Sequence, residues 1–305
     1  MKIIVTLPDN NYYLWQTLVQ MHNFIKFGIN DNVLYLIGKN SIQKSTILEN
    51  IMLKTNSKFE FMILKDDRVN PKYPVSLRPF LMKKLFEKKP EYKEEAIFYI
   101  DPDMIFTKKI NFNQFLKNNT WYLSNTKSYI DSNYIKSKST KLFNEMCDIV
   151  GIDPKIVEIN DNNAGGAQSI MKNLSYEYWE KVEADSEKLY QHMINTSHIY
   201  SPEYPIQFWT AEMWAQLWNA WLFGHETKIS KKLDFCWATD EIKRWSEVGI
   251  YHNAGATINN GKYFIKTKYQ NSPFNKELNC SDEYCSYMYV KEIKETENHY
   301  SNILF

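Results

Sequence analysis

Residues 96–106 have the sequence AIFYIDPDMIF, in which an apolar run typical of a buried strand ends in two carboxylates, Asp101 and Asp103. Residues i and i+2 of a strand share one face, so these carboxylates can converge on one hard cation where the strand ends in a turn. The segment therefore predicts a Mn²⁺ or Mg²⁺ site for the phosphates of a nucleotide. A solvated turn is the alternative, because Asp and Pro are common in turns.

The region around this segment alternates strand and helix patterns. Strands are expected at residues 2–7, 32–37, 59–64 and 96–100, and helices at residues 12–27, 41–53 and 77–88. Such alternation predicts an α/β fold with βαβ units and a parallel sheet. Ligands of such sheets bind beyond the carboxyl ends of the strands, which is where Asp101 and Asp103 fall.

The second half of the chain has a different, mainly helical pattern. It predicts a strand at residues 121–124, helices at residues 141–150, 176–194 and 210–223, and a glycine-containing loop at residues 162–168. The tail from residue 274 onward is polar with weak periodicity. We see neither an internal repeat nor a linker long enough to force a split into separate domains.

The composition is that of a globular protein, with 305 residues, 44% hydrophobic and 24% charged. A formal net charge of +1 excludes a global basic field for nonspecific nucleic-acid binding. Four separated cysteines favour free thiols in a reducing compartment. We expect a soluble cytoplasmic protein, because no run approaches the ~20 apolar residues of a membrane span. Only three arginines among 37 basic residues indicate a low-GC bacterial or viral genome, and a viral protein would act in the host cytoplasm.

A late segment, GIYHNAGA at residues 249–256, contains a second candidate ligand, His252. An imidazole that completes a carboxylate site is typical of Mn²⁺, and Gly255 would allow the backbone to approach a phosphate. Lys266 and Lys268 are spaced to reach the same anion. A structural histidine and two solvated lysines are the alternatives.

Three further features lie between these segments. The segment NNAGGAQ at residues 162–168 predicts backbone packed against a ligand, or alternatively a tight turn. Glu212 is either a helix-capping acid or a carboxylate that binds a sugar hydroxyl. The tryptophans of the following helix share one face and form either core or an aromatic wall of an acceptor site: Trp214, Trp218 and Trp221.

Taken together, FYIDPD (98–103), NAGGAQ (163–168) and HNAG (252–255) resemble nucleotide-sugar glycosyltransferases of the GT-A fold. The nearest similarity is to the hydroxyproline O-arabinosyltransferase-like group, with glycosyltransferase family 8 more distant. The resemblance implies a Rossmann-like, mixed but mostly parallel sheet flanked by helices. It implies one domain at residues 1–270, with a nucleotide-binding half (1–107), an acceptor and sugar half (108–270) and a tail (271–305).

The resemblance also implies roles for individual residues. The metal ligands would be Asp101, Asp103 and His252. Asn163, Gly165 and Gly166 match the loop beside the donor sugar, with Gln168 as their neighbour. From the residues themselves, Arg78, Asp101, Gly255 and Lys266 are further candidates for binding the donor, and Glu212 and Gln168 for meeting the reacting sugar. The chain departs from family 8 where it has Ala211-Glu212-Met213 in place of an acidic-Gln-acidic motif, and its late motif lacks the Lys-Pro-Trp continuation.

These inferences predict a metal-dependent transferase that moves a sugar from a nucleoside diphosphate to a hydroxyl, with retained configuration implied by the resemblance. The acceptor would be a glycan, a protein or a hydroxymethylated base of viral DNA. The DNA acceptor predicts a basic patch, formed by Lys136, Lys138 and Lys141, and salt-sensitive binding. An Asp-x-Asp phosphohydrolase and a noncatalytic sugar-binding module are the alternative functions.

Overall fold

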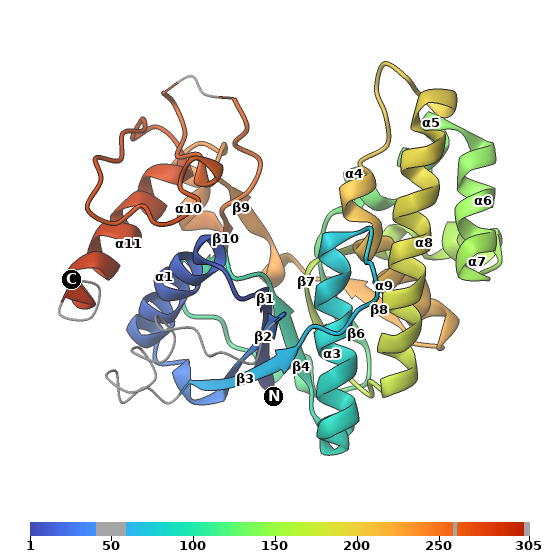
Figure 1. Ribbon diagram of the computed structural model, residues 1–305, viewed down its shortest axis with the longest axis horizontal. Helices are drawn as coiled ribbons and strands as arrows, with labels where there is room; N and C mark the ends of the chain where they lie inside the picture. Colours follow the sequence, from blue (N-terminus) through green and yellow to red (C-terminus); the bar gives the residue numbers. More distant parts are fainter. Residues whose placement is uncertain (41–58, 259–260, 302–305) are drawn as a thin grey trace. The chain divides into compact units, whose positions relative to one another are not determined.

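The computed structural model describes residues 1–40, 59–258 and 261–301. Seven strands form a mixed sheet in the order β3-β2-β1-β4-β7-β6-β8, flanked by helices (Figure 1). The mixed α/β architecture predicted from the sequence is confirmed. The helix expected at residues 41–53 lies outside the described residues.

The chain divides into two compact units. Unit 1 comprises Met1–Lys2, Asp66–Tyr99 and Phe112–Lys231, and unit 2 comprises Ile3–Lys65, Ile100–Asn111 and Lys232–Phe305.

Unit 2 begins with three parallel strands, β1 (Lys2–Pro8), β2 (Val33–Lys39) and β3 (Glu60–Lys65). The interior of β1 is completely buried, as expected for an apolar run covered on both faces. Helix α1 (Asn11–Phe27) follows β1. It begins at Asn10, whose side chain accepts from the Tyr13 N–H, and ends at Gly28 in the left-handed conformation (φ 65°).

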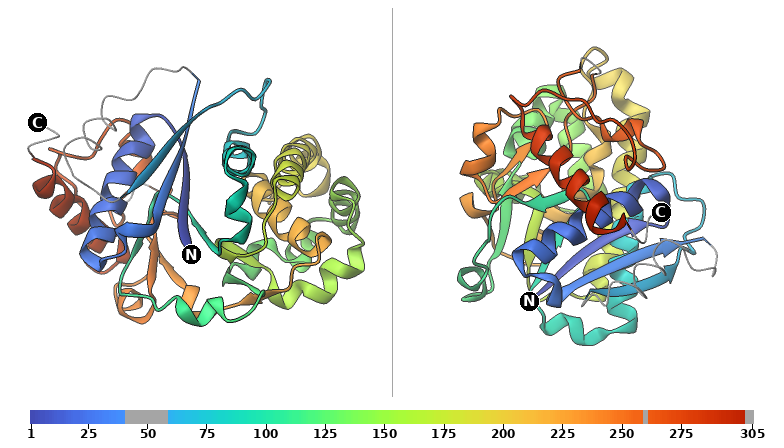
Figure 2. Two further views of the ribbon diagram at one scale, coloured as in Figure 1. Left: turned by 90° about the horizontal axis from the view of Figure 1, so that it is seen from below. Right: turned by 90° about the vertical axis from the view of Figure 1, so that its left-hand side faces the viewer.

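A second, three-stranded sheet in unit 2 has the order β5-β10-β9. Its strands are β5 (Met104–Phe106), β9 (Phe235–Trp237) and β10 (Ile250–His252). Helix α10 (Lys243–Glu247) precedes β10, and helix α11 (Cys285–His299) lies beside α1 (Figure 2). Helix α11 lies in the polar tail, where no helix was predicted.

Unit 1 contains strands β6 (Trp121–Asn125), β7 (Gly165–Met171) and β8 (Thr227–Ile229), with β7 antiparallel to both β4 (Ile97–Ile100) and β6. Its longer helices pack side by side, with α8 (Tyr176–Tyr200) against α3 (Leu77–Lys88) and α9 (Ala211–Leu222) (Figure 1). The shorter helices are α4 (Lys127–Ile130), α5 (Ser132–Lys138), α6 (Thr140–Val150) and α7 (Pro154–Asn160).

One boundary predicted from the sequence was wrong. The segment 162–168 was expected to be a loop, but β7 begins at Gly165, so Gly165, Gly166 and Gln168 lie on a strand. A Cβ atom on Gly165 would collide with the Ser124 carbonyl oxygen of β6 and with the Ile229 side chain. Crowding between neighbouring strands therefore accounts for this glycine without any ligand.

Candidate functional site

Three candidate metal ligands meet in unit 2, as the sequence predicted for Asp101, Asp103 and His252. One ligand atom from each lies within 4.8 Å of the others. The Nε2 atom of His252 is 3.6 Å from Asp101 Oδ2 and 3.4 Å from Asp103 Oδ1. The two carboxylates occupy the turn between β4 and β5, and antiparallel pairing places His252 opposite Met104. Strand pairing thus joins residues that lie about 150 positions apart in the sequence.

The chemistry of this group fits a divalent cation. Carboxylate oxygens suit Mg²⁺ and Mn²⁺, and an imidazole shifts the preference toward Mn²⁺. Asp103 and His252 are buried, whereas Asp101 is partly exposed. The ring of Trp237 stacks on that of His252 at a centroid distance of 5.3 Å, so packing fixes the imidazole plane. Within the described part of the chain, His252 Nδ1 has no hydrogen-bond partner.

Side chains of α1 hold the backbone of the carboxylate turn. The Gln20 amide donates to the carbonyls of Asp101 (2.8 Å) and Met104 (2.7 Å). Asn23 donates to the Phe106 carbonyl and accepts from the Phe106 N–H. Both α1 residues are buried. Neither residue was predicted from the sequence, although amides among the apolar residues of a helix are a usable signal, because buried amides need partners.

Lys266 contacts the same site directly, because its ammonium forms an ion pair with Asp103 Oδ2. Burial would raise the pKa of Asp103, but the charges of Lys266 and His252 hold this pKa well below its usual value. The carboxylate is therefore ionised at neutral pH, as a metal ligand must be. Lys268, two residues further along, is exposed.

Gly255 follows the histidine in a left-handed conformation, with a φ of 85°. A Cβ atom there would meet the Thr239 hydroxyl at 3.6 Å and Trp237 at 3.9 Å, which are ordinary contacts. The backbone conformation, rather than lack of space, therefore favours glycine at this position.

A buried polar cluster in unit 1 contains two other predicted residues, Arg78 and Glu212. The guanidinium Nη1 of Arg78 on α3 lies 3.1 Å from Glu212 Oε2 on α9. The Gln216 amide donates to the other carboxylate oxygen, Glu212 Oε1. Arg78 also lies over the ring of Tyr99, 4.9 Å from its centroid. Because Glu212 is only 2% exposed, its ionised carboxylate is stabilised by hydrogen bonds from Arg78 and Gln216 more than by water.

The glycine segment of β7 borders a small cavity in unit 1. Gly165, Gly166 and Gln216 contribute to its lining. Gly166 has a φ of 133°, and a Cβ atom there would meet only the Ser169 hydroxyl, at 3.5 Å. Gln168 is completely buried, with its N–H donating to the Ser124 hydroxyl.

Asn163 lies in a short 3₁₀ helix (Asp161–Asn163) just before β7. Its carbonyl accepts from the Thr227 hydroxyl at 3.5 Å. The backbone of Asn163 is thus tied to β8, next to the cavity that Thr227 also lines.

The tryptophans of α9 form core. Trp214 and Trp218 are completely buried and Trp221 is 7% exposed. The indole N–H of Trp214 donates to the Ile130 carbonyl, and that of Trp221 donates to the Thr227 hydroxyl. The prediction of a core stripe is confirmed, and the alternative of an aromatic wall at these three positions is wrong.

The lysines expected to form a DNA-binding patch have local partners. Lys136 pairs with Glu158, and Lys141 lies 3.8 Å from Glu145. The ammonium of Lys138 lies 5.2 Å from the centroid of the Tyr134 ring. The two carboxylates reduce the positive charge of this region.

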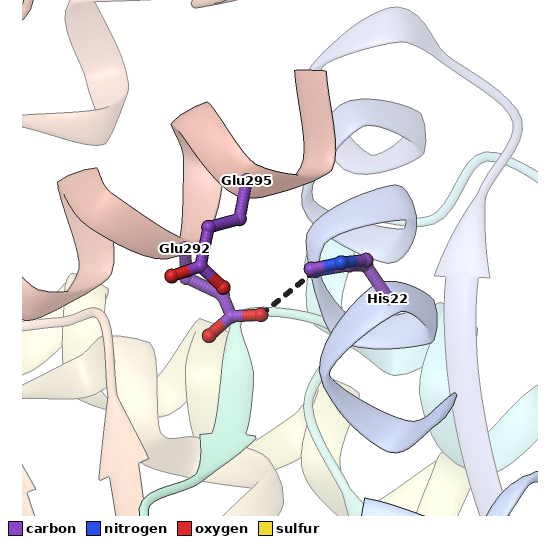
Figure 3. Close-up of side chains that lie close together, drawn as sticks. All are labelled: His22, Glu292 and Glu295. Atoms are coloured by element: carbon purple, nitrogen blue, oxygen red, sulfur yellow. Dashed lines mark hydrogen bonds and ion pairs between the residues drawn. The ribbon is translucent and has the colours of Figure 1, made fainter. Parts of the chain in front are cut away.

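A second group of possible metal ligands joins α1 to α11 in unit 2. Figure 3 shows His22 facing Glu292 and Glu295, and ligand atoms of all three lie within 4.8 Å of one another. His22 Nδ1 is 2.8 Å from Glu292 Oε1. The ammonium of Lys26 lies 2.9 Å from Glu292 and 2.5 Å from Glu295. The Lys26 ammonium thus partly offsets the charge of these carboxylates, and the cluster ties the two helices together.

Two general expectations can also be compared with the structure. All four cysteines are free thiols, as expected. Among the described residues, no helix has both the length and the apolar character needed to cross a bilayer.

The sequence matches no family model and no curated protein. Similar solved structures include the galactosyltransferase LgtC in complex with donor and acceptor sugar analogs (TM-score 0.47, 8% identity, covering 99% of this chain and 100% of that chain). They also include apo GlyE of Streptococcus pneumoniae TIGR4 (0.46, 9%, covering 99% and 63%). A third is apo mouse xyloside xylosyltransferase 1 (0.43, 9%, covering 85% and 99%). All three neighbours are glycosyltransferases.

Proposed function

We propose that this protein is a metal-dependent glycosyltransferase, which moves a sugar from a nucleoside diphosphate to an acceptor hydroxyl. The observation that carries the proposal is the convergence of Asp101, Asp103 and His252 within 4.8 Å. Two carboxylates and an imidazole at the end of a buried strand are a donor set for Mn²⁺ or Mg²⁺. The resemblance of the three sequence motifs to GT-A enzymes makes a nucleotide sugar the proposed substrate.

Transfer of the sugar requires that the nucleoside diphosphate be stabilised as it leaves. A divalent cation, when bound, would offset the negative charge that develops on the departing phosphate. Asp101, Asp103 and His252 would hold it. The low pKa of Asp103 keeps this ligand ionised. Lys266 is held at the same carboxylate and would donate to phosphate oxygens once a diphosphate enters, adding charge-assisted hydrogen bonds.

The residues of unit 1 are proposed to serve the sugar. Asn163 and Gly166 would contact the donor sugar, while Gly165 is required by the packing of β6 against β7. Arg78 would offer its guanidinium to sugar hydroxyls, and the buried carboxylate of Glu212, which pairs with it, is proposed to hold that guanidinium in place. Gln168, which the resemblance places beside the site, is completely buried. It is therefore proposed to hold strand β7 in position rather than to contact the sugar.

We propose that the configuration of the sugar is retained, as the resemblance implies. In that route the departing phosphate takes the proton of the acceptor hydroxyl, so no strong general base is needed. This fits Glu212, both of whose carboxylate oxygens accept hydrogen bonds from side chains. The anomeric configuration of the product, measured by NMR, tests this part of the proposal, and an inverted product would refute it.

The proposed function is tested by thermal-shift and donor-hydrolysis assays with a nucleotide-sugar panel, with and without Mn²⁺. The variants are Asp103→Ala and Asp101→Asn. Glu295→Gln is the matched control, because it removes a carboxylate from the other histidine-carboxylate cluster of unit 2. We expect Mn²⁺-dependent stabilisation by a nucleotide in the wild type and in the control, and its loss in both site variants.

Two other outcomes would replace the proposal. Hydrolysis of simple phosphate esters without nucleotide preference would indicate a phosphohydrolase. Glycan binding that needs no Mn²⁺ and is unchanged by Asp103→Ala would indicate a noncatalytic sugar-binding module.

A further inference from the structure

Trp209 differs from the tryptophans that follow it because it is 54% exposed, whereas those of α9 are core residues. It lies in the short 3₁₀ helix Phe208–Thr210, immediately before α9. Tyr204, five residues earlier, is 73% exposed. An isolated exposed aromatic side chain is ordinary. Whether the exposed side chain of Trp209 is suited to bind a ligand therefore depends on the residues around it.

The backbone that carries Trp209 is firmly anchored. The hydroxyl of the completely buried Tyr73 donates to the Trp209 carbonyl at 2.5 Å. The rings of these two residues meet edge to face, with centroids 6.0 Å apart. The Gln207 N–H donates to the Tyr134 hydroxyl, and the Thr210 hydroxyl donates to the Gln207 carbonyl. An exposed but fixed aromatic side chain loses little conformational entropy when it binds a ligand.

The same anchor connects Trp209 to the polar cluster of unit 1. The Tyr73 hydroxyl accepts a hydrogen bond from the Glu212 N–H at 3.3 Å while it donates to Trp209. Glu212 in turn pairs with Arg78. One buried hydroxyl thus ties the backbone of Trp209 to the backbone of Glu212. A sugar ring has an apolar C–H face, and the exposed indole of Trp209, on its anchored backbone, offers a flat surface complementary to that face.

We propose that Trp209 forms a subsite for a glycan acceptor, in which its indole packs against the face of a pyranose ring. This rests on the proposed glycosyltransferase function and names the class of its acceptor. A nucleobase can also stack on an indole. A nucleic acid, however, needs cations for its phosphates. The lysines Lys136 and Lys141 pair with carboxylates, and the residue next to Tyr204 is the exposed acid Glu203.

The experiment measures transfer to a panel of methyl hexopyranosides and disaccharides, with duplex DNA carrying hydroxymethylated bases and a hydroxyproline peptide as other acceptors. The variants are Trp209→Ala and Trp209→Phe. Phe223→Ala is the matched control, because Phe223 is a 41% exposed aromatic residue just beyond the other end of α9. Thermal denaturation of each variant verifies that it folds.

We expect Trp209→Ala to raise the KM for the saccharide acceptor by about tenfold with a smaller change in kcat, as for the loss of one aromatic stack. Trp209→Phe should recover most of that loss, and Phe223→Ala should match the wild type. An unchanged acceptor KM in folded Trp209→Ala overturns the subsite, and so does transfer only to DNA or to the peptide. Absence of metal-dependent donor binding and hydrolysis in the wild type refutes the proposed function itself, which separates the two failures.

Discussion

Replacement of Lys266 by Met should strengthen the binding of Mn²⁺ and weaken the binding of a nucleoside diphosphate. Without a cation, the Lys266 ammonium pairs with Asp103, one of the three proposed ligands. A divalent cation must compete with this ammonium for the same carboxylate. A diphosphate, by contrast, benefits from it. The two ligands should therefore respond to the substitution in opposite directions.

The magnitude follows from Coulomb's law. A unit charge and a double charge about 5 Å apart repel by about 7 kcal/mol at an effective dielectric constant of about 20. The Lys266 side chain is 25% exposed, and its flexible stem lets the ammonium move away when a cation enters. We therefore expect only about a quarter of that repulsion to remain, on the order of 1.5 kcal/mol or tenfold in affinity.

Calorimetric titration with Mn²⁺, and then with a nucleoside diphosphate in saturating Mn²⁺, measures both effects. Lys268→Met is the control, because it removes an exposed lysine from the same short 3₁₀ helix, Lys266–Lys268. Mn²⁺ affinity that is unchanged or weaker in Lys266→Met would show that the ammonium does not compete for the site, and the reasoning would fail.

Three further predictions concern stability. Arg78→Met leaves Glu212 buried without this cation and should lower the free energy of unfolding, measured by chemical denaturation, by about 3 kcal/mol. Adding Glu212→Gln should recover part of this loss. A double variant no more stable than Arg78→Met would contradict a stabilising ion pair. Burial would raise the pKa of Glu292, but His22 and Lys26 on α1 hold this pKa below its usual value of 4.5. The stabilisation of the fold by the ionised Glu292 is therefore fully present above about pH 4.5, and it is lost as the pH falls through the lower pKa of the folded state. Glu292→Gln should therefore lower the Tm at pH 7 and flatten its decline in acid, and an unchanged Tm profile would argue against this linkage. Gly165→Ala should lower the Tm by several degrees because its Cβ meets a backbone carbonyl, and an unchanged Tm would show that the strands can separate.

The three proposed metal ligands could be predicted from the sequence because each lies where a short pattern ends. Asp101 and Asp103 follow an apolar strand, and His252 ends another. The resemblance linked them across a long separation, which no local pattern could do. The contact of Lys266 with Asp103 was not predicted, because it depends on how a segment without a strong periodicity folds back onto the turn.

The role of Gly165 and the presence of helix α11 depend on tertiary contacts, which local sequence patterns do not reveal. Gly165 has the same local pattern whether a ligand or a neighbouring strand crowds it, and only the pairing of β7 with β6 distinguishes these cases. Helix α11 was missed because lysines and glutamates surround its buried residues. Its apolar positions do recur at helical spacing, as Cys285, Tyr289 and Ile293.

The hydrogen bonds from Gln20 to the carbonyls of Asp101 and Met104 have a kinetic consequence. They fix the path of the main chain before any ion arrives, so little rearrangement of the main chain should accompany ion entry. The rate of entry should then depend on how readily the ion gives up its own water. Mg²⁺ releases water reluctantly. We therefore expect Mg²⁺ to load more slowly than Mn²⁺, even at concentrations where both would fill the site at equilibrium.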